Sequence, residues 1–281
     1  MRLGVTTFAT DQSMPVPELA REAETRGLHS LFLPEHTHIP TSRLTPPPTG
    51  DAVLPEEYKR TVDPFVVLAA AAAVTSQIRL GTGILLVAQR EPLVTAKAAA
   101  TLDLISGGRL DLGVGFGWNR EELADHGVAP TERRNVAREH VLAMRELWRS
   151  EVASFAGEHA AFEPSWSWPK PIQPGGPPVL LGGAPGPTLF AHIAEYGDGW
   201  LPIGGGGIRA ALPMLHDAYA RRGRDPADLR VVPFGTIPDA GKLDYYEHLG
   251  IDEVVLRVPS ATRDQVLAVL DDYGALVNAR R

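Results

Sequence analysis

The chain lacks cysteine, a long hydrophobic run and an excess of basic residues. Because none of its 281 residues is cysteine, it cannot form disulfides, cysteine-ligated zinc sites, iron–sulfur clusters or a thiol nucleophile. Its most apolar stretch, residues 65–74, is far shorter than the roughly 20 residues that span a bilayer. Lys and Arg number 27 against 34 Asp and Glu, and the resulting net charge of −7 disfavours nucleic acid and anionic membranes as partners.

The N-terminal segment, residues 1–8, has the pattern of a strand and lacks the apolar core and cleavage site of a signal peptide. We therefore expect no leader and no membrane anchor. A chain without cysteine is compatible with a reducing compartment, so the expected location is the cytoplasm.

Short apolar segments alternate with helical patterns along the chain. The expected strands are residues 3–8, 30–33, 78–87, 110–114, 179–181, 200–203, 231–234 and 253–257, and the expected helices are 17–26, 64–75, 92–105, 136–148, 187–196, 210–222 and 263–277. Such alternation is typical of a parallel sheet buried on both faces. Eight units in a chain of this length favour a (β/α)₈ barrel, also called a TIM barrel. No linker divides the sequence, so residues 1–281 are expected to form a single domain.

Two long segments interrupt this alternation. Residues 40–63 follow the second strand, and residues 151–178, which contain Trp166 and Trp168, precede the fifth. Loops of this length are lids, binding loops or disordered segments. Loops after barrel strands lie on the catalytic face, so the first segment is a candidate lid, with a solvated surface loop as the alternative. We expect residues 40–63, Trp166, Trp168 and residues 204–207 to determine the substrate.

A carboxylate and a histidine stand together at the end of the second strand, as Glu35 and His36. This pair suits proton transfer or a hydrogen bond to a ligand ring. Two alternatives stay open. His36 and His38 have the spacing of a zinc pair, although the other histidines offer no convincing third ligand. His36 is also compatible with a purely structural role.

Glycines gather at the ends of the next strands. The third strand contains Gly81 and Gly83, the fourth ends in Gly-x-Gly-x-Gly (residues 113–117) before Asn119, and the fifth ends in Gly182-Gly183. Glycine inside a strand marks a bulge or the close approach of a backbone or flat ligand. The turn after Gly183 opens a helix, whose N-terminus can bind phosphate. Relief of crowding and an ordinary tight turn are the alternatives.

In this order, the strand ends resemble the bacterial luciferase-like monooxygenase superfamily, and more closely its branch that uses the deazaflavin coenzyme F420. The resembling segments are residues 33–36, 63–65 leading into 69–75, 78–83, 106–110, 112–119, 169–173, 182–183 and 197–200. They cover most of the chain, from the first strand to about the sixth.

The resemblance implies a luciferase-like barrel with the coenzyme ring across its C-terminal face. Gly83–Ile84 aligns with a non-prolyl cis peptide that lies under the ring. Glu35 and His36 match the acidic residue and the histidine near the ring, and His36 matches the proposed acid/base. Asn119, Gly182 and Gly183 match positions that contact the ring or its ribityl phosphate. The resemblance also implies a homodimer, paired through the helices after strands two and three.

One position departs from the family pattern. F420-dependent sugar-phosphate dehydrogenases carry a catalytic Glu where Phe116 stands here, which argues against that activity and leaves any second proton donor unassigned. We expect an oxidoreductase that transfers a hydride between F420 and a small-molecule substrate. The alternatives are an FMN-dependent monooxygenase of the same superfamily, a metal-dependent hydrolase built on His36 and His38, and a non-catalytic cofactor-binding protein.

Overall fold

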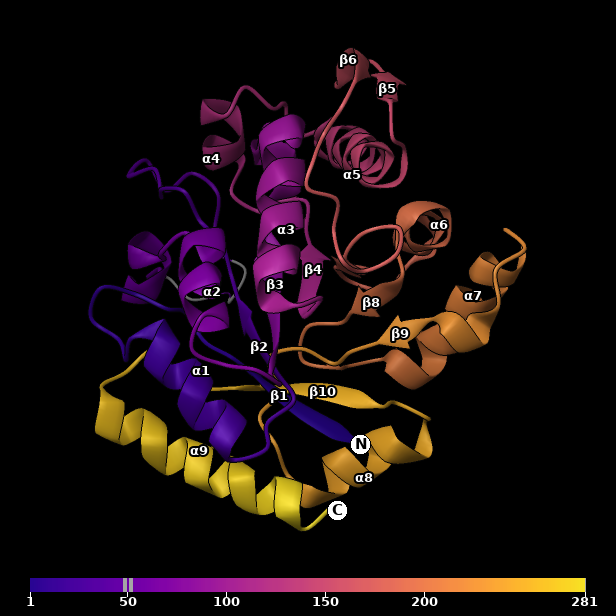
Figure 1. The fold of residues 1–281 in the computed structure, drawn as a ribbon. Coiled ribbons are helices and arrows are strands. Elements are labelled where there is room, and N and C mark those ends of the chain that lie inside the picture. The colour runs from indigo at the N-terminus through magenta and orange to yellow at the C-terminus, as the bar shows by residue number, and fades with distance from the viewer. Residues whose placement is uncertain (48–49, 51–52, 281) are drawn as a thin grey trace.

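The computed structural model describes residues 1–47, 50 and 53–280. Within this part of the chain, eight parallel strands form a nearly closed barrel with helices around it (Figure 1). The barrel strands in chain order are β1 (Arg2–Thr6), β2 (Ser30–Leu33), β3 (Arg79–Leu85), β4 (Leu110–Val114), β7 (Val179–Gly182), β8 (Gly199–Leu201), β9 (Arg230–Val231) and β10 (Glu253–Arg257). β1 pairs with both β2 and β10. The chain after β9 closes the ring, where Thr236 N donates to Val255 O at 3.0 Å. The expected (β/α)₈ barrel is confirmed.

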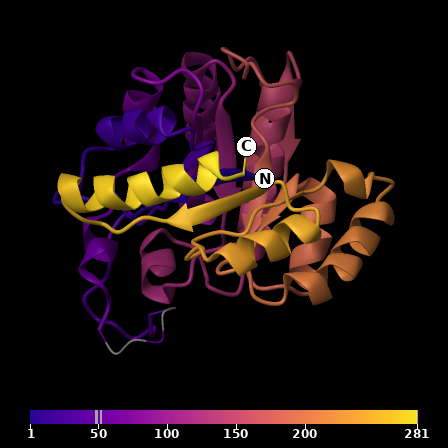
Figure 2. The ribbon, with the colours of Figure 1, turned by 90° about the horizontal axis from the view of Figure 1, so that it is seen from below.

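The helices lie outside the barrel. They are α1 (Val16–Thr25), α2 (Pro64–Ala72), α3 (Pro92–Ser106), the short α4 (Arg120–Asp125), α5 (Arg133–Arg149), α6 (Pro187–Tyr196), α7 (Ile208–Ala220), α8 (Ala240–His248) and α9 (Arg263–Asn278). α9 lies along α1, and the two ends of the chain are on the same side of the barrel (Figure 2). Among the described residues, none of these helices is long and apolar enough to cross a membrane.

Two helices that border the site begin in the same way. Asp63 and Glu91 accept backbone N–H groups of α2 and α3, at 3.1 Å from Val66 N and 2.6 Å from Val94 N. Each is followed by a proline at the first helical position, where a missing N–H costs nothing. These signals fix the helix starts that the sequence predicted.

The barrel interior is filled by a small apolar cluster, separate from the larger core between strands and helices. It consists of Phe32, Leu180, Leu201, Val232, Phe234 and Val255. Two glycines of β3 leave space for the rings of this cluster. A Cβ on Gly81 would lie 2.4 Å from the Phe32 ring, and a Cβ on Gly83 would lie 2.3 Å from the Phe234 ring. Side-chain packing therefore accounts for Gly81 and Gly83 without a ligand.

Charged side chains close the N-terminal end of the barrel. Asp111 is fully buried and accepts hydrogen bonds from Arg79 Nε at 2.7 Å and Arg230 Nη1 at 2.8 Å. Arg230 also bonds to Glu253, whose other oxygen accepts the Ser30 hydroxyl at 2.6 Å. This end of the barrel is thus occupied by structural ion pairs, which leaves the C-terminal end for a ligand.

Several segments differ from the sequence-based expectation. Residues 151–178 are not only a loop, because they form a hairpin of β5 (Ala153–Ala156) and β6 (Ala161–Ser165) outside α5 (Figure 1). The first excursion contains a 3₁₀ helix, η1 (Glu56–Arg60), and residues 48–49 and 51–52 of that excursion lie outside the described residues. The strand expected at residues 231–234 is shorter in the structure, where β9 covers only Arg230–Val231. Helices α4 and α8 were not expected from the sequence.

Candidate functional site

His36 lies beyond the C-terminal end of β2 and forms a buried pair with Glu122 of α4. His36 Nδ1 is 2.8 Å from Glu122 Oε2, and the side chains of the two residues are 6% and 1% exposed. The other oxygen of Glu122 accepts the N–H of Thr37 at 3.1 Å. Two donors from the segment after β2 therefore converge on one carboxylate.

The hydrogen bonds around His36 define its tautomer. A carboxylate only accepts hydrogen bonds, so Nδ1 carries the proton that is shared with Glu122. On the other side of the ring, Trp118 Nε1 donates to His36 Nε2 across 3.4 Å. Since an indole nitrogen is only a donor, Nε2 is the lone-pair side of the imidazole. His36 thus presents a basic nitrogen that a buried carboxylate holds in place.

Two aromatic side chains pack beside the His36 ring. The Trp118 ring lies 5.8 Å from the His36 ring at 75°, and Tyr58 of η1 lies 5.5 Å from it. Tyr58 brings the first excursion to the histidine. Arg43, from the same excursion, places its guanidinium carbon 5.8 Å from the Trp118 ring. The candidate lid therefore contacts the surroundings of His36.

Glu35 does not pair with His36, although the two are adjacent in sequence. Its carboxylate accepts Leu86 N at 2.7 Å and Arg90 Nε at 2.6 Å, and Arg90 also bonds to Asp63. Burial raises the pKa of Glu35, and the charge of Arg90 works against that rise. Glu35 therefore holds the segment that follows β3.

The C-terminal part of β3 holds the expected cis peptide, between Gly83 and Ile84. The Ile84 side chain lies over two glycines of neighbouring strand ends. A Cβ on Gly115 would fall 1.7 Å from Ile84 Cδ1, and one on Gly182 would fall 2.9 Å from Ile84 Cγ2. Gly115 and Gly182 thus make room for Ile84, which forms an apolar platform at the mouth of the barrel.

Asn119 connects this mouth to the His36 pair. It is the N-cap of α4, and its Oδ1 accepts the N–H of Glu121 at 3.2 Å and of Glu122 at 3.4 Å. Its Nδ2 is buried with no hydrogen-bond partner among the described residues, and so are both polar atoms of the Gln89 side chain. Unpaired buried amides are costly, and a ligand with carbonyl or ring-nitrogen groups would satisfy them.

Gly183 follows β7 with φ of 149°, and its carbonyl accepts Trp200 Nε1 at 3.0 Å. α6 begins four residues later, and its N-cap residue, Gly186, supplies no side-chain cap. The structure therefore brings His36, Ile84, Asn119, Gly182 and Gly183 to one end of the barrel. Glu122 is the residue that sequence reasoning missed.

His36 and His38 do not share a metal site in the structure. His38 is turned to Asp125, at 2.9 Å, while His36 is held by Glu122. Throughout the described part of the chain, no group of three or more His, Asp or Glu side chains has metal-binding geometry.

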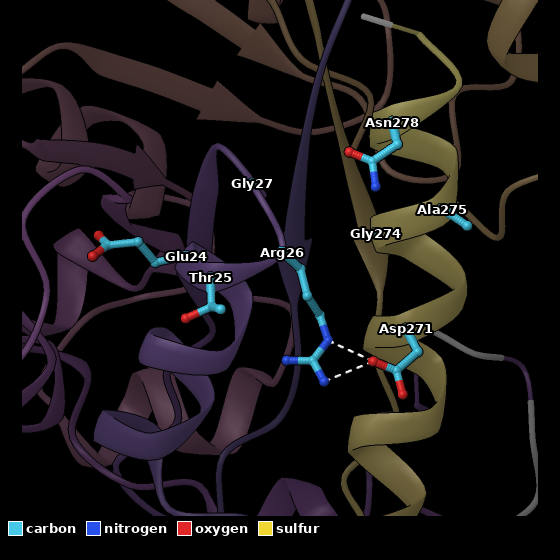
Figure 3. Close-up of a pocket in the computed structure, with 8 residues that line it drawn as sticks. All are labelled: Glu24, Thr25, Arg26, Gly27, Asp271, Gly274, Ala275 and Asn278. Atoms are coloured by element: carbon cyan, nitrogen blue, oxygen red, sulfur yellow. Dashed lines mark hydrogen bonds and ion pairs between the residues drawn. The ribbon is translucent and has the colours of Figure 1, made fainter.

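Two surface cavities lie outside the His36 pair. One, of about 510 Å³, lies between α1 and α9, where Arg26 is bonded to Asp271 (Figure 3). It is at the N-terminal edge of the sheet, because Gly27 lies three residues before the start of β2. The other, of about 570 Å³, lies within the first excursion and is lined by Ile39, Pro40, Thr41, Arg43, Leu44, Pro46, Pro47, Val53, Leu54 and Lys59.

Comparison with known proteins agrees with this architecture. The family model described as "Luciferase-like monooxygenase" matches residues 3–238. An uncharacterized protein of Mycobacterium tuberculosis is 43% identical over 278 residues, 98% of each chain. An F420-dependent glucose-6-phosphate dehydrogenase of Kineococcus radiotolerans is 32% identical over 74% of this chain and 58% of its own.

Solved structures share the fold over the whole chain. Monooxygenase RslO1 from Streptomyces bottropensis superposes with a TM-score of 0.81 at 21% identity, covering 100% of both chains. An F420-dependent secondary alcohol dehydrogenase superposes with a TM-score of 0.80 at 18% identity, covering 100% of this chain and 99% of that one.

Proposed function

Because the chain belongs to the luciferase-like monooxygenase family, whose members are oxidoreductases or monooxygenases, we propose that it transfers a hydride between coenzyme F420 and a small organic substrate. The observation that carries the proposal is the His36–Glu122 pair, which presents Nε2 of His36 at the same end of the barrel as the Ile84 platform. The 32% identical F420-dependent dehydrogenase supports the choice of coenzyme.

The residues at the barrel mouth fit such a coenzyme. A deazaflavin supplies a carbon that accepts or donates hydride and reacts poorly with oxygen. In the proposal, Ile84 supports its ring, and the unpaired Nδ2 of Asn119 donates to it. The same proposal places the side chain of the coenzyme against the backbone of Gly182 and Gly183. Glu35 positions the segment that carries Ile84, through its bond to Leu86 N.

His36 supplies the acid/base step. When a substrate hydroxyl is oxidised, the hydride leaves the carbon and Nε2 of His36 accepts the hydroxyl proton; in the reverse direction Nε2 returns it. Glu122 keeps the proton on Nδ1, so Nε2 is the nitrogen that accepts the substrate proton, in place of its 3.4 Å contact with the Trp118 indole. Glu122 also stabilises the imidazolium that forms. Trp118 and Tyr58 exclude water from this nitrogen.

In this proposal, the substrate binds in the cavity within the first excursion. Its cavity is lined mainly by apolar side chains together with Arg43 and Lys59, and Arg43 lies over Trp118, which contacts His36. A small substrate with an apolar body fits this lining. Phe116 stands where sugar-phosphate dehydrogenases of the family carry a catalytic Glu, so oxidation of a sugar phosphate is not proposed.

Titration separates the two coenzymes. We expect F420 to bind the purified protein at micromolar concentration and FMN to bind more weakly. In stopped-flow assays with candidate alcohols and ketones, replacement of His36 by Asn is expected to lower turnover about 10²- to 10⁴-fold, the usual contribution of a general acid–base, with F420 affinity retained. Tighter binding of FMN, with oxygen-dependent turnover, would favour the FMN-dependent monooxygenase instead.

We also propose that residues 1–281 act as one domain, and that two copies pair through the outer faces of α2 and α3. These helices lie side by side (Figure 1) and expose Val66, Leu93, Val94, Leu104 and Ile105, while Trp168 lies beside Lys97 of α3 and is 59% exposed. Exposed apolar side chains on adjoining helices are a feature of protein interfaces. A cytoplasmic location is part of the same proposal.

A further inference from the structure

An arginine without a counter-charge lies in the first excursion, next to the tryptophan that contacts His36. The guanidinium carbon of Arg43 is 5.8 Å from the centre of the Trp118 ring, and Trp118 Nε1 donates to His36 Nε2 across 3.4 Å. Nη1 of Arg43 is buried and, among the described residues, has neither a hydrogen-bond partner nor a carboxylate in ion-pair contact. The charge of Arg43 is therefore available to a ligand.

The chain on either side of Arg43 is held to α4, which fixes where the guanidinium lies. Glu121 accepts Leu44 N at 2.6 Å and Thr45 N at 2.9 Å, together with the Thr45 hydroxyl. Arg43 itself has φ of 51° and is the one non-glycine residue of the described chain with a positive φ. Glycine adopts this conformation without strain, whereas a larger residue persists there only where surrounding contacts impose it. An arginine at this position is therefore explained by what its side chain binds.

The acidic residues of α4 do not neutralise this guanidinium, because each already has a partner. Glu121 holds the backbone of the excursion, Glu122 holds His36, and Asp125 holds His38. An anion from outside the chain would supply the missing counter-charge.

Arg43 lines the cavity of about 570 Å³ within the first excursion. Most of the other lining side chains are apolar, and the second cation of the cavity, Lys59, has its Nζ 2.8 Å from Glu56 Oε2. An apolar cavity with one unpaired charge suits a ligand that has an apolar body and one end of opposite charge.

The donors at this position match a carboxylate. A guanidinium can form two parallel hydrogen bonds to a planar carboxylate. A phosphoryl group carries three acceptor oxygens and about two negative charges, so it needs further donors. The amides that follow Arg43, Leu44 N and Thr45 N, are not available to it, because both donate to Glu121. One guanidinium without neighbouring amides favours a monoanion.

We propose that Arg43 binds a carboxylate of the substrate, and that the substrate is an acid with an apolar body and a hydroxyl or oxo group at its other end. The identity of the reacting group rests on the proposed function. Since Trp118 connects Arg43 to His36, we expect several bonds between the carboxylate and the carbon that reacts. Carboxylate binding itself is tested on the protein without coenzyme, so its outcome does not depend on hydride transfer.

The first experiment compares octanoate with octanamide, which has the same chain length and no charge, by calorimetry on the full chain. Octanoate is expected to bind more tightly than octanamide. Arg43→Gln is expected to weaken octanoate binding about 10-fold or more, the loss of one charge-assisted contact, and to change octanamide affinity less than about 2-fold. Equal affinities of the wild type for both ligands, or equal octanoate affinities of wild type and variant, would overturn the proposal.

The matched control is Arg120→Gln. Arg120 is exposed in the first turn of α4, where its N–H donates to Thr45 Oγ1 at 3.3 Å, and it is not among the residues that line the cavity. Its replacement removes one positive charge from the same surroundings and is expected to change octanoate affinity less than about 2-fold. A loss as large as that in Arg43→Gln would show a general effect of charge and refute a site at Arg43.

Arg43→Gly guards against loss of folding. Because glycine fits φ of 51° without strain, the urea midpoint is expected to be unchanged or higher, while octanoate binds as weakly as in Arg43→Gln. A lower midpoint with unchanged octanoate affinity would mean that the arginine serves the fold, contrary to the proposal.

Two alcohols, 7-hydroxyoctanoate and 2-octanol, extend the test to the reaction. They share the chain and the position of the hydroxyl, and only the first carries a carboxylate. In the oxidation, the C–H bond of the alcohol carbon breaks, its hydride passes to the coenzyme and the hydroxyl proton passes to His36 Nε2, which leaves a ketone. With coenzyme bound, Arg43→Gln is expected to raise KM for 7-hydroxyoctanoate about 10-fold with little change in kcat, and to change KM for 2-octanol less than about 2-fold.

Equal changes in KM for the two alcohols would overturn the carboxylate site. Turnover of neither alcohol, together with octanoate binding that depends on Arg43, would contradict the hydride-transfer proposal and still support this site.

Discussion

Glu122 is joined to His36 by a 2.8 Å hydrogen bond between Oε2 and Nδ1, although 86 residues separate them in sequence. The second oxygen of the same carboxylate accepts Thr37 N. Glutamine is nearly the same shape but offers one acceptor, so in Glu122→Gln one of the two donors must face an amide NH₂. This substitution therefore tests whether the role of His36 in catalysis depends on the carboxylate of Glu122.

We expect Glu122→Gln to lower kcat with little change in coenzyme affinity. A buried donor left without an acceptor costs about 1–3 kcal/mol, or roughly 5- to 150-fold. Steady-state kinetics and coenzyme titration separate the two effects. The matched control is Asp125→Asn, a change on the same helix as Glu122. It breaks the exposed pair between Asp125 and His38 and should keep kcat. Equal kcat in wild type and Glu122→Gln would remove Glu122 from the mechanism.

Glu121 is expected to make the first excursion acid-sensitive. Its carboxylate accepts the Thr45 hydroxyl, and also Leu44 N at 2.6 Å and Thr45 N at 2.9 Å. These hydrogen bonds, of which the one from the Thr45 hydroxyl has the largest effect, lower the pKa of Glu121 from 4.5 to about 2. The folded state therefore binds this proton less tightly than the unfolded chain. The contact stabilises above pH 4.5 and is lost as pH falls towards 2.

Hydrogen exchange of Leu44 and Thr45 amides measures this directly. After correction for intrinsic rates, their protection should fall between pH 4.5 and 2, and in Glu121→Gln it should be low at every pH. Protection that is independent of pH and of the variant would show that other contacts hold the excursion.

The ion pairs at the N-terminal end of the barrel should matter for stability and not for the site. Burial alone would raise the pKa of Asp111, but hydrogen bonds and charges from Arg79 and Arg230 lower it. Asp111→Asn leaves two arginines without their shared carboxylate and should cost about 3–5 kcal/mol in urea unfolding. Asp271→Asn removes the exposed partner of Arg26 and should cost less than about 1 kcal/mol. Similar losses in both variants would contradict the structural role of the buried cluster.

The proposed dimer predicts that charge on the outer face of α2 and α3 separates the subunits. Val66 and Val94 are 69% and 68% exposed, so the double change to Glu should not disturb the barrel. Sedimentation equilibrium is expected to give twice the chain mass for wild type and the single mass for the variant. Ile237→Glu, which changes a residue 72% exposed elsewhere, is the control. A monomeric wild type would rule out the pairing.

The sequence by itself determined the barrel. The expected ranges of β2, β4, α6 and β10 agree with the structure to the residue, because apolar runs, proline starts and glycine stops are local signals. α8 was missed, since its sequence is largely polar and its apolar face is only Leu243 and Tyr246. The hairpin of β5 and β6 was missed because its strands are short and largely exposed.

Only the tertiary structure decided which carboxylate serves His36. In sequence, Glu35 is its neighbour and Glu122 is one of two glutamates in a polar run, so nothing distinguishes Glu122 from Glu121. Helix α4 turns Glu122 inward to His36 and Glu121 outward to the excursion, while β3 brings Leu86 and Arg90 to Glu35. Local sequence patterns indicate which residues are buried and where helices and strands begin and end. A hydrogen bond between residues 86 positions apart, in contrast, depends on how the strands close the barrel.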